Sequence, residues 1–254
     1  RAHHARHYAG DQVVVAAAGP LEHDRLVAVV EEAFDGLAPG LTHARPAAVA
    51  AAGRRAFVGR DLEQTHIAVG GCGIGRTDDR RFALAVLDQI LGGGASSRLW
   101  QEIREQRGLV YSVYSYVTYF QETGQVGLAL GTRSENLSEA LGVAAAEIHD
   151  LAQGRFRDGE VQRAKDNLKA RLLLTMDSTV ARMSRLGRHL VSNVPLMSDA
   201  EVARRIDGVT EADVRDLAAE LFAPDALCVA GIGPDEAAFD AALGAFREPV
   251  GGAA

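Results

Sequence analysis

The stretch that decides the fold is residues 91–115, LGGGASSRLWQEIREQRGLVYSVYS. It opens with three glycines that end a preceding helix, and Ser96 or Ser97 then caps a second helix. Gly108 supplies the left-handed residue that commonly terminates a helix. Residues 109–118 alternate as in a strand, which puts Tyr111 and Val113 on the same face and Tyr114 on the other. The stretch therefore predicts a helix and a strand that are joined by one tight corner at Gly108.

This corner brings two hydrogen-bond donors close together. Arg104 lies in the last turn of the predicted helix, and Tyr111 lies three residues into the predicted strand. A guanidinium and a phenol both donate hydrogen bonds at neutral pH, so the pair suits the binding of a peptide carbonyl or a developing oxyanion. From spacing alone, a surface arginine and a half-buried sheet tyrosine are the commoner outcome. A phosphate-binding loop at the three glycines is disfavoured, because no Gly-Lys-[Ser/Thr] follows them.

Hydrophobic periodicity on either side of this stretch predicts one α+β domain at 57–246. Strands are expected at 65–72, 109–118, 125–132 and 227–232, and the second and third form an antiparallel hairpin. Apolar residues at helical spacing occur at 82–91, 137–151, 158–175, 179–191, 199–206, 211–221 and 235–246. Helix caps are expected at Asp78-Asp79, Thr132-x-x-Glu135, Ser198-x-x-Glu201 and Thr210-x-x-Asp213. This order of elements predicts helices grouped against an antiparallel sheet.

The first residues repeat the pattern of the last ones. A short apolar strand pattern at 13–18 precedes helical spacing at 22–36, and the closing residues 226–246 show the same strand, Gly-Pro turn and helix. Residues 1–37 are therefore expected to be the C-terminal remnant of an earlier domain that is built like the later one. The remaining boundaries are a Pro- and Gly-containing linker at 38–56 and a tail at 247–254.

Composition limits the class of protein. With 47% hydrophobic and 24% charged residues over 254 positions, the chain resembles a globular protein with a sizeable core. The net charge of −7 is spread without a basic block, so no nucleic-acid partner is expected. No apolar run reaches the roughly 18 residues of a membrane span, so a soluble protein without a membrane partner is expected; the compartment stays open, with the cytoplasm favoured. Cys72 and Cys228 stand singly in apolar runs and are expected to be buried free thiols.

The stretch at 91–115 resembles the signature of the C-terminal domain of pitrilysin-type (insulinase, inverted-zincin) zinc metallopeptidases, which include mitochondrial processing peptidase and insulin-degrading enzyme. The resemblance continues in EQTHI at 63–67, RMSRLG at 182–187 and VTEADV at 209–214, and it covers nearly the whole chain. In this family an arginine and a tyrosine seven positions apart reach from the second half into the active site. Arg104 and Tyr111 occupy these positions, so the resemblance implies that both are catalytic.

The resemblance also implies a two-domain enzyme whose half-domains carry helices on one face of a sheet. In the family, zinc is held in the first domain by the inverted motif His-x-x-Glu-His and a distal glutamate. This sequence contains no such motif, so zinc is expected in the complete enzyme and none on this chain. His3 and His7 are four residues apart but lack a third ligand, so they are expected to be exposed. This chain alone is therefore predicted not to hydrolyse peptides.

Two functions from different classes remain open. The chain is expected to be the C-terminal part of a zinc-dependent endopeptidase that binds a peptide or unfolded protein and stabilises the transition state. Its partner would be the missing zinc-bearing domain or subunit, in one chain or in a homo- or heterodimer. The alternative is a catalytically inactive peptidase-like partner or scaffold subunit. The coding sequence upstream of Arg1 discriminates between them, because the single-chain enzyme requires His-x-x-Glu-His there.

Overall fold

The computed structural model describes residues 8–37, 48 and 53–247, and the chain divides into two compact units. The smaller unit consists of Arg1–Ala47 and Ala170–Asp199, and the larger one of Ala48–Lys169 and Ala200–Ala254. The larger unit holds the whole sheet and the stretch at 91–115, so it alone positions the candidate site.

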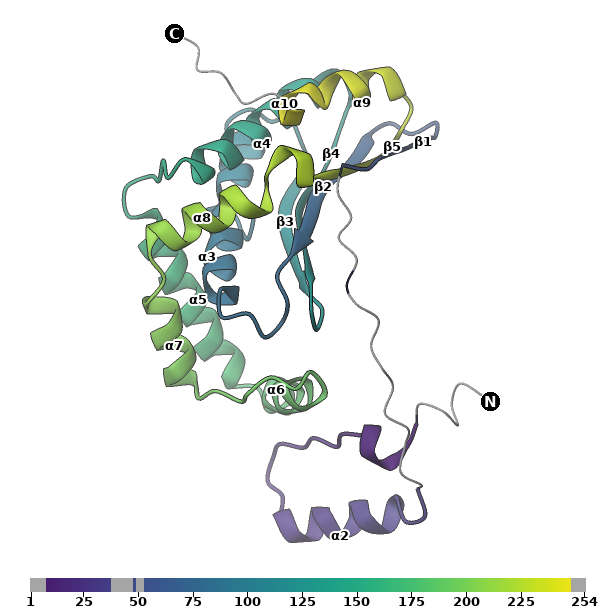
Figure 1. Cartoon of the computed structure of the whole chain (residues 1–254), viewed down its shortest axis with the longest axis vertical. Coiled ribbons are helices and arrows are strands. Elements are labelled where there is room, and N and C mark those ends of the chain that lie inside the picture. The colour runs from purple at the N-terminus through teal and green to yellow at the C-terminus, as the bar shows by residue number, and fades with distance from the viewer. Residues whose placement is uncertain (1–7, 38–47, 49–52, 248–254) are drawn as a thin grey trace. The chain divides into compact units, whose positions relative to one another are not determined.

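A five-stranded sheet forms the centre of the larger unit (Figure 1). Its strands are β1 (Arg55–Gly59), β2 (Thr65–Gly73), β3 (Ser112–Tyr119), β4 (Gly124–Thr132) and β5 (Cys228–Gly233), in the order β1-β5-β2-β4-β3. The pairs β5-β2, β2-β4 and β4-β3 are antiparallel, and the predicted hairpin is confirmed as β3-β4. The edge strand β1 pairs in parallel with β5. The α+β class is thus confirmed, in a mixed sheet.

The strand β1 was not predicted, and it begins inside the predicted linker at 38–56. Only its central residue, Phe57, is half-buried, while the four residues around it are exposed. Such an edge strand has no alternation of buried and exposed residues to reveal it. Its place is fixed by backbone pairing with β5, which lies far away in the sequence, and by contact between the rings of Phe57 and Phe239 at 4.9 Å.

Figure 1 shows α3, α4 and α8 on the same side of the sheet. The helices of the larger unit are α3 (Arg81–Leu91), the π-helix η2 (Trp100–Glu105), the 3₁₀ turn η3 (Ser134–Asn136), α4 (Leu137–Ala152), the first part of α5 (Glu160–Met176), α7 (Asp199–Asp207), α8 (Glu211–Leu221), the 3₁₀ turn η4 (Pro224–Ala226), α9 (Glu236–Ala242) and α10 (Gly244–Arg247). The core lies between them and the sheet, where Leu84, Leu128 and Leu141 are fully buried. Among the described residues, no helix is long and apolar enough to cross a membrane.

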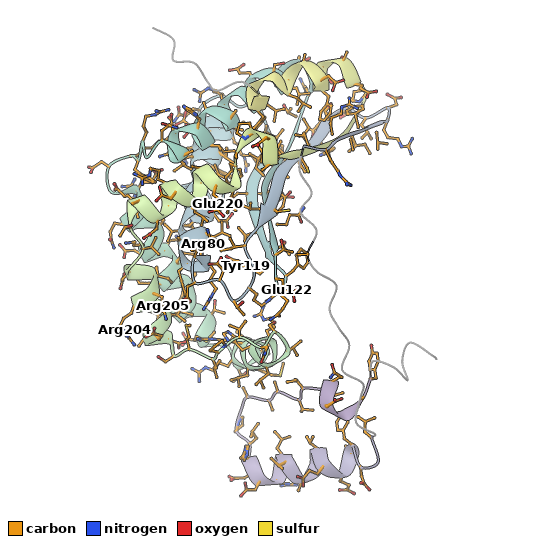
Figure 2. The ribbon with its side chains drawn as sticks, in the orientation of Figure 1. Arg80, Tyr119, Glu122, Arg204, Arg205 and Glu220 are labelled. Atoms are coloured by element: carbon orange, nitrogen blue, oxygen red, sulfur yellow. The ribbon has the colours of Figure 1, made fainter. Side chains whose placement is uncertain are left out.

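The start of α3 is linked to α8 by side-chain charges. The cap predicted at Asp78-Asp79 is wrong, because the cap residue of α3 is Arg80 and no side chain caps the helix; the carboxylate of Asp78 instead accepts a hydrogen bond from the backbone N–H of Arg80 at 2.8 Å. The side chain of Arg80 pairs with Asp78 and with Glu220 of α8, at 2.9 and 2.7 Å (Figure 2). The hydrogen bond from the Arg80 side chain lowers the pKa of Asp78 below its usual value. These contacts are largely exposed, so they orient the two helices more than they stabilise them.

The capping box predicted at Thr132 and Glu135 is wrong. Thr132 is the last residue of β4 and is buried, and its hydroxyl donates a hydrogen bond to the carbonyl of Leu109 at 2.5 Å. The turn η3 precedes α4, and the cap residue Asn136 makes no side-chain hydrogen bond. A threonine hydroxyl can cap a helix or donate to a buried carbonyl group, and the spacing of residues in the sequence does not distinguish these two roles.

The smaller unit contains η1 (Gly10–Gln12), α2 (His23–Ala33), the end of α5, and α6 (Thr179–Val191). The strand predicted at 13–18 is wrong for this structure, because no described strand pairs with these residues and a strand needs a partner for its hydrogen bonds. The helix predicted at 22–36 is confirmed as α2. A Cβ atom on Gly187 would lie 3.3 Å from that of Ala16, so α6 packs closely on this segment. Most of the predicted linker at 38–56 and of the tail lies outside the described residues.

The capping box at the start of α8 yields a test of stability. Asp213 accepts hydrogen bonds from the hydroxyl and the backbone N–H of Thr210, and both bonds lower the pKa of Asp213 below 3.8. Replacing Asp213 by alanine is expected to lower the free energy of unfolding by about 1 kcal/mol at pH 7. Because the folded-state pKa is depressed, this stabilisation exists above pH 3.8 and is lost as the pH falls through the lower, folded-state pKa. In urea denaturation, the difference in unfolding free energy between the wild type and the alanine variant should therefore be smaller near pH 3 than at pH 7.

Candidate functional site

The glycines after α3 bring the end of this helix against β3. A Cβ atom on Gly92 would lie 2.1 Å from the backbone nitrogen of Ser115, which leaves room for glycine only. The hydroxyl of Ser115 donates to the carboxylate of Asp88 in α3 at 2.5 Å and lies 3.1 Å from the carbonyl of the same residue. The triple glycine thus serves close packing of a helix on a strand, and it leads directly into the candidate site.

Between the glycines and Gly108 the chain forms the π-helix η2, where an ordinary helix was expected. The N–H of Gln106 donates to the carbonyl of Gln101 at 2.9 Å, five residues back. Such wide turns are rare and often occur at functional sites. Gly108 has a φ of +62°, and its N–H donates to the carbonyl of Arg104 at 3.0 Å. The predicted left-handed end of this helix is therefore confirmed.

A buried arginine anchors the beginning of this segment. Arg98 is only 2% exposed, and it donates two hydrogen bonds to the carboxylate of Glu160, at 2.9 and 2.6 Å. It also pairs with Glu147 of α4 at 3.2 Å and donates to the carbonyl of Arg155 at 2.8 Å. One side chain thereby ties the residues just before η2 to α4 and to the start of α5. The anchor fixes the beginning of η2 relative to the core.

Arg104 and Tyr111 lie together at the corner. The guanidinium carbon of Arg104 lies over two aromatic rings, 3.9 Å from the centroid of Trp100 and 5.5 Å from that of Tyr111. Tyr111 is 79% exposed, because β3 begins only at Ser112, three residues later than predicted. The prediction that Tyr111 shares a sheet face with Val113 is therefore wrong. Trp100 was not singled out from the sequence, although its spacing of four residues from Arg104 is the spacing of helical neighbours.

Arg104 differs from the other arginines of its segment in having no acidic partner among the described residues. Arg98 is paired as described, and Arg107 pairs with Glu102 at 2.8 Å. Within the ranges that the structure describes, Arg104 makes neither an ion pair nor a side-chain hydrogen bond. Its contacts are the two rings, which leave its N–H groups available. The corner therefore presents a guanidinium and a phenol that a ligand can bind.

The face of the sheet opposite α3, α4 and α8 is hollowed. A cavity of about 450 Å³ is lined by Ser112 and Tyr114 of β3, Ala129 of β4 and Ile232 of β5. Ser112 directly follows Tyr111 in the chain, but neither Tyr111 nor Arg104 lines this cavity. A second cavity of about 550 Å³ lies on the same face and includes Cys72, Cys228 and Tyr116 in its lining. The two cysteines are half-buried, so the prediction of buried thiols is wrong; α3, α4 and α8 of the larger unit lie on the other face of the sheet.

A zinc site does not fit the described part of this chain. No three histidine, cysteine, aspartate or glutamate side chains come together there in a way that could hold a metal ion. His3 and His7 lie outside the described residues. What the site can supply chemically is therefore hydrogen-bond donation and positive charge from Arg104 and Tyr111.

Two glycines allow a matched test of the corner. Gly108 has a positive φ, whereas Gly142 lies in the middle of α4 without one, and a Cβ atom on either would meet nothing within 4 Å. Replacing Gly108 by alanine is expected to lower the free energy of unfolding by about 1 kcal/mol, because the backbone of an alanine is strained at a positive φ. Replacing Gly142 by alanine should instead raise it by about 0.5–1 kcal/mol. Equal effects in urea denaturation would contradict the left-handed corner.

Comparison with known proteins agrees with this architecture. The sequence pattern of the family described as "Peptidase M16 inactive domain" matches residues 1–168. An uncharacterized zinc protease of Streptomyces coelicolor is 38% identical over 230 residues, which are 87% of this chain and 50% of the relative. An uncharacterized zinc protease of Mycobacterium tuberculosis is 37% identical over 224 residues, which are 86% of this chain and 51% of the relative.

Solved structures share the fold. A peptidase M16 inactive domain from Pseudomonas fluorescens superimposes with a TM-score of 0.75 at 25% identity, covering 85% of this chain and 52% of that one. A chain of complex III2 from Candida albicans superimposes with a TM-score of 0.81 at 21% identity, over 96% of this chain and 61% of that one, which shows the fold alone. The chain spans about half the length of the curated relatives it matches. Sequence and structure together place the chain in the peptidase M16 family, in the part that is described as its inactive domain.

Proposed function

We propose that this chain is the non-zinc half of an M16 zinc endopeptidase, in which Arg104 and Tyr111 bind the substrate carbonyl and stabilise the tetrahedral intermediate. The observation that carries the proposal is the corner itself. A guanidinium with no acidic partner in the described part of the chain lies 5.5 Å from the ring of an exposed tyrosine, in the positions where the family resemblance expects catalytic donors.

The chemistry of the two groups fits a role in acyl transfer. As a nucleophile adds to the scissile carbonyl, negative charge develops on the carbonyl oxygen. The guanidinium of Arg104 is always charged and donates from fixed directions, and the hydroxyl of Tyr111 is a neutral donor. Hydrogen bonds to a developing oxyanion strengthen as the charge grows, so they lower the barrier more than they tighten substrate binding. The zinc of the complete enzyme would belong to a part of the protein other than the residues described here.

The uncovered sheet face supports binding of a peptide or unfolded protein. The cavity of about 450 Å³ is lined mainly by small and apolar residues, including Ala68, Ala129 and Ile232, and its polar lining residues include Ser112 and Tyr114. Such a lining accepts apolar side chains of different shapes without requiring one sequence. A substrate that lies along this face can place one of its carbonyl groups at the corner.

The smaller unit supports a further part of the proposal, that residues 1–37 belong to the zinc-bearing domain. Apolar side chains of this segment are exposed, among them Val15, Val29 and Phe34. Apolar surface of this kind commonly marks a site of contact with other protein. The contact would be supplied by the zinc-bearing domain or subunit, either in one chain or in a dimer.

Zinc content and peptide hydrolysis of the complete protein test the proposal. The complete protein is this chain together with the zinc-bearing half, and it is expected to hold one zinc per active site and to cleave a quenched fluorescent peptide. A chelator should abolish cleavage, and added zinc should restore it. A complete protein that binds the peptide but holds no zinc and cleaves nothing would instead support the catalytically inactive partner or scaffold.

A further inference from the structure

Trp100 holds the Arg104 guanidinium more closely than Tyr111 does. The distance of 3.9 Å from the guanidinium carbon to the Trp100 centroid is van der Waals contact, whereas 5.5 Å to Tyr111 approaches the outer limit of about 6 Å for a cation–π interaction. Trp100 is also half-buried, while Tyr111 is largely exposed. The direction of the guanidinium is therefore set mainly by the tryptophan ring.

Trp100 also keeps the neighbouring carboxylate away from Arg104. Its indole N–H donates a hydrogen bond to Glu105 at 3.1 Å. Glu105 is adjacent to Arg104 in the chain, yet the two make no ion pair in the described part of the structure. An ion pair would occupy the same N–H groups that a substrate carbonyl needs. The side chain of Trp100 thus covers the guanidinium and also binds the acid that follows Arg104 in the chain.

We infer that Trp100 is a positioning residue for Arg104, an inference that rests on the proposed function. The ring holds the guanidinium in van der Waals contact on one side and leaves its N–H donors for the substrate carbonyl. Pre-organised donors act without reorganisation during the reaction, so their loss lowers turnover more than it weakens substrate binding. The π-helical turn explains how Trp100 contacts Arg104 and Glu105 at once, because both lie within one wide turn of it.

Replacing Trp100 in the complete protein tests the inference. Trp100→Leu is expected to lower kcat about tenfold and to change KM by less than about twofold, because only the positioning of a donor is lost. Trp100→Phe keeps an aromatic face and should retain kcat within about threefold of the wild type. If the phenylalanine variant loses as much activity as the leucine variant, the ring does not act by stacking and the inference fails. The melting temperature of each variant is measured, and kcat and KM are determined at a temperature at which both variants and the wild type are folded.

A double-mutant cycle separates this inference from the proposed function. If Trp100 acts through Arg104, then Trp100→Leu lowers kcat no further in an Arg104→Ala background. Independent, multiplicative losses would overturn the positioning role and leave the role of Arg104 intact. A fully active Trp100→Leu variant beside an impaired Arg104→Ala variant would likewise overturn the positioning role and leave the role of Arg104 intact. If Arg104→Ala alone has wild-type kcat, the proposed function fails, and the positioning role fails with it.

Discussion

Replacing Arg104 by alanine in the complete protein is expected to lower kcat for peptide hydrolysis about a hundredfold, and Tyr111→Phe should have an effect of similar size. In the proposed mechanism, each substitution removes one hydrogen-bond donor to an oxygen that becomes charged in the transition state. Because the ground-state carbonyl is a weaker acceptor, kcat should fall more than KM rises. Steady-state kinetics with a quenched fluorescent peptide measures both constants.

Arg133 offers a control for the loss of one positive charge. Its side chain is 73% exposed, and the nearest acid in contact, Glu135, is 3.8 Å away. Arg133→Ala therefore changes the net charge of the chain as Arg104→Ala does, and it should leave kcat unchanged. Since Arg104 and Tyr111 are in contact, the double variant should lose less than the product of the two single losses. Near-wild-type turnover in both single variants would remove the pair from the mechanism.

The corner could be predicted from the sequence because its determinants are local. The end of a helix at Gly108 can be predicted from the helical periodicity before it and from a glycine that readily adopts a left-handed conformation. The hairpin β3-β4 is likewise predicted by the alternating patterns on both sides of a short turn. Proximity of Arg104 and Tyr111 follows from that corner alone. Their proposed role came from resemblance to a family, since spacing alone favours a surface arginine.

The features that escaped prediction are set by distant parts of the chain or by fine geometry. β1 exists through parallel pairing with β5, in which Arg55 pairs with Val229, roughly 170 residues later in the chain. The wide turn of η2 differs from an α-helix in one hydrogen bond, and no apolar spacing distinguishes the two in six residues. The exposure of Tyr111 depends on where β3 begins, and strand ends are not marked by alternation. The uncovered sheet face is visible only once the helices are seen on the other side.

Replacing Arg98 by leucine is expected to lower the free energy of unfolding by about 3–5 kcal/mol. The substitution leaves the carboxylates of Glu147 and Glu160, whose side chains are 12% and 11% exposed, without their buried cation. Arg133→Ala is again the control and should change stability by less than about 0.5 kcal/mol. A variant that replaces Arg98, Glu147 and Glu160 together by apolar residues of similar size should recover much of the loss, because no buried charge then remains.

The pH dependence of the Arg98→Leu effect checks the same cause with a definite sign. Burial raises the pKa of Glu147 even though Arg157 and Arg98 favour its charged form. Without Arg98 the pKa of Glu147 should rise further, since one opposing cation is gone. A carboxyl whose folded pKa is raised stabilises the fold fully below its unfolded pKa, and this stabilisation is lost as the pH rises through the folded pKa. The destabilisation by Arg98→Leu should therefore be smaller near pH 5 than near pH 8 in urea denaturation, and a loss independent of pH would instead indicate missing packing volume.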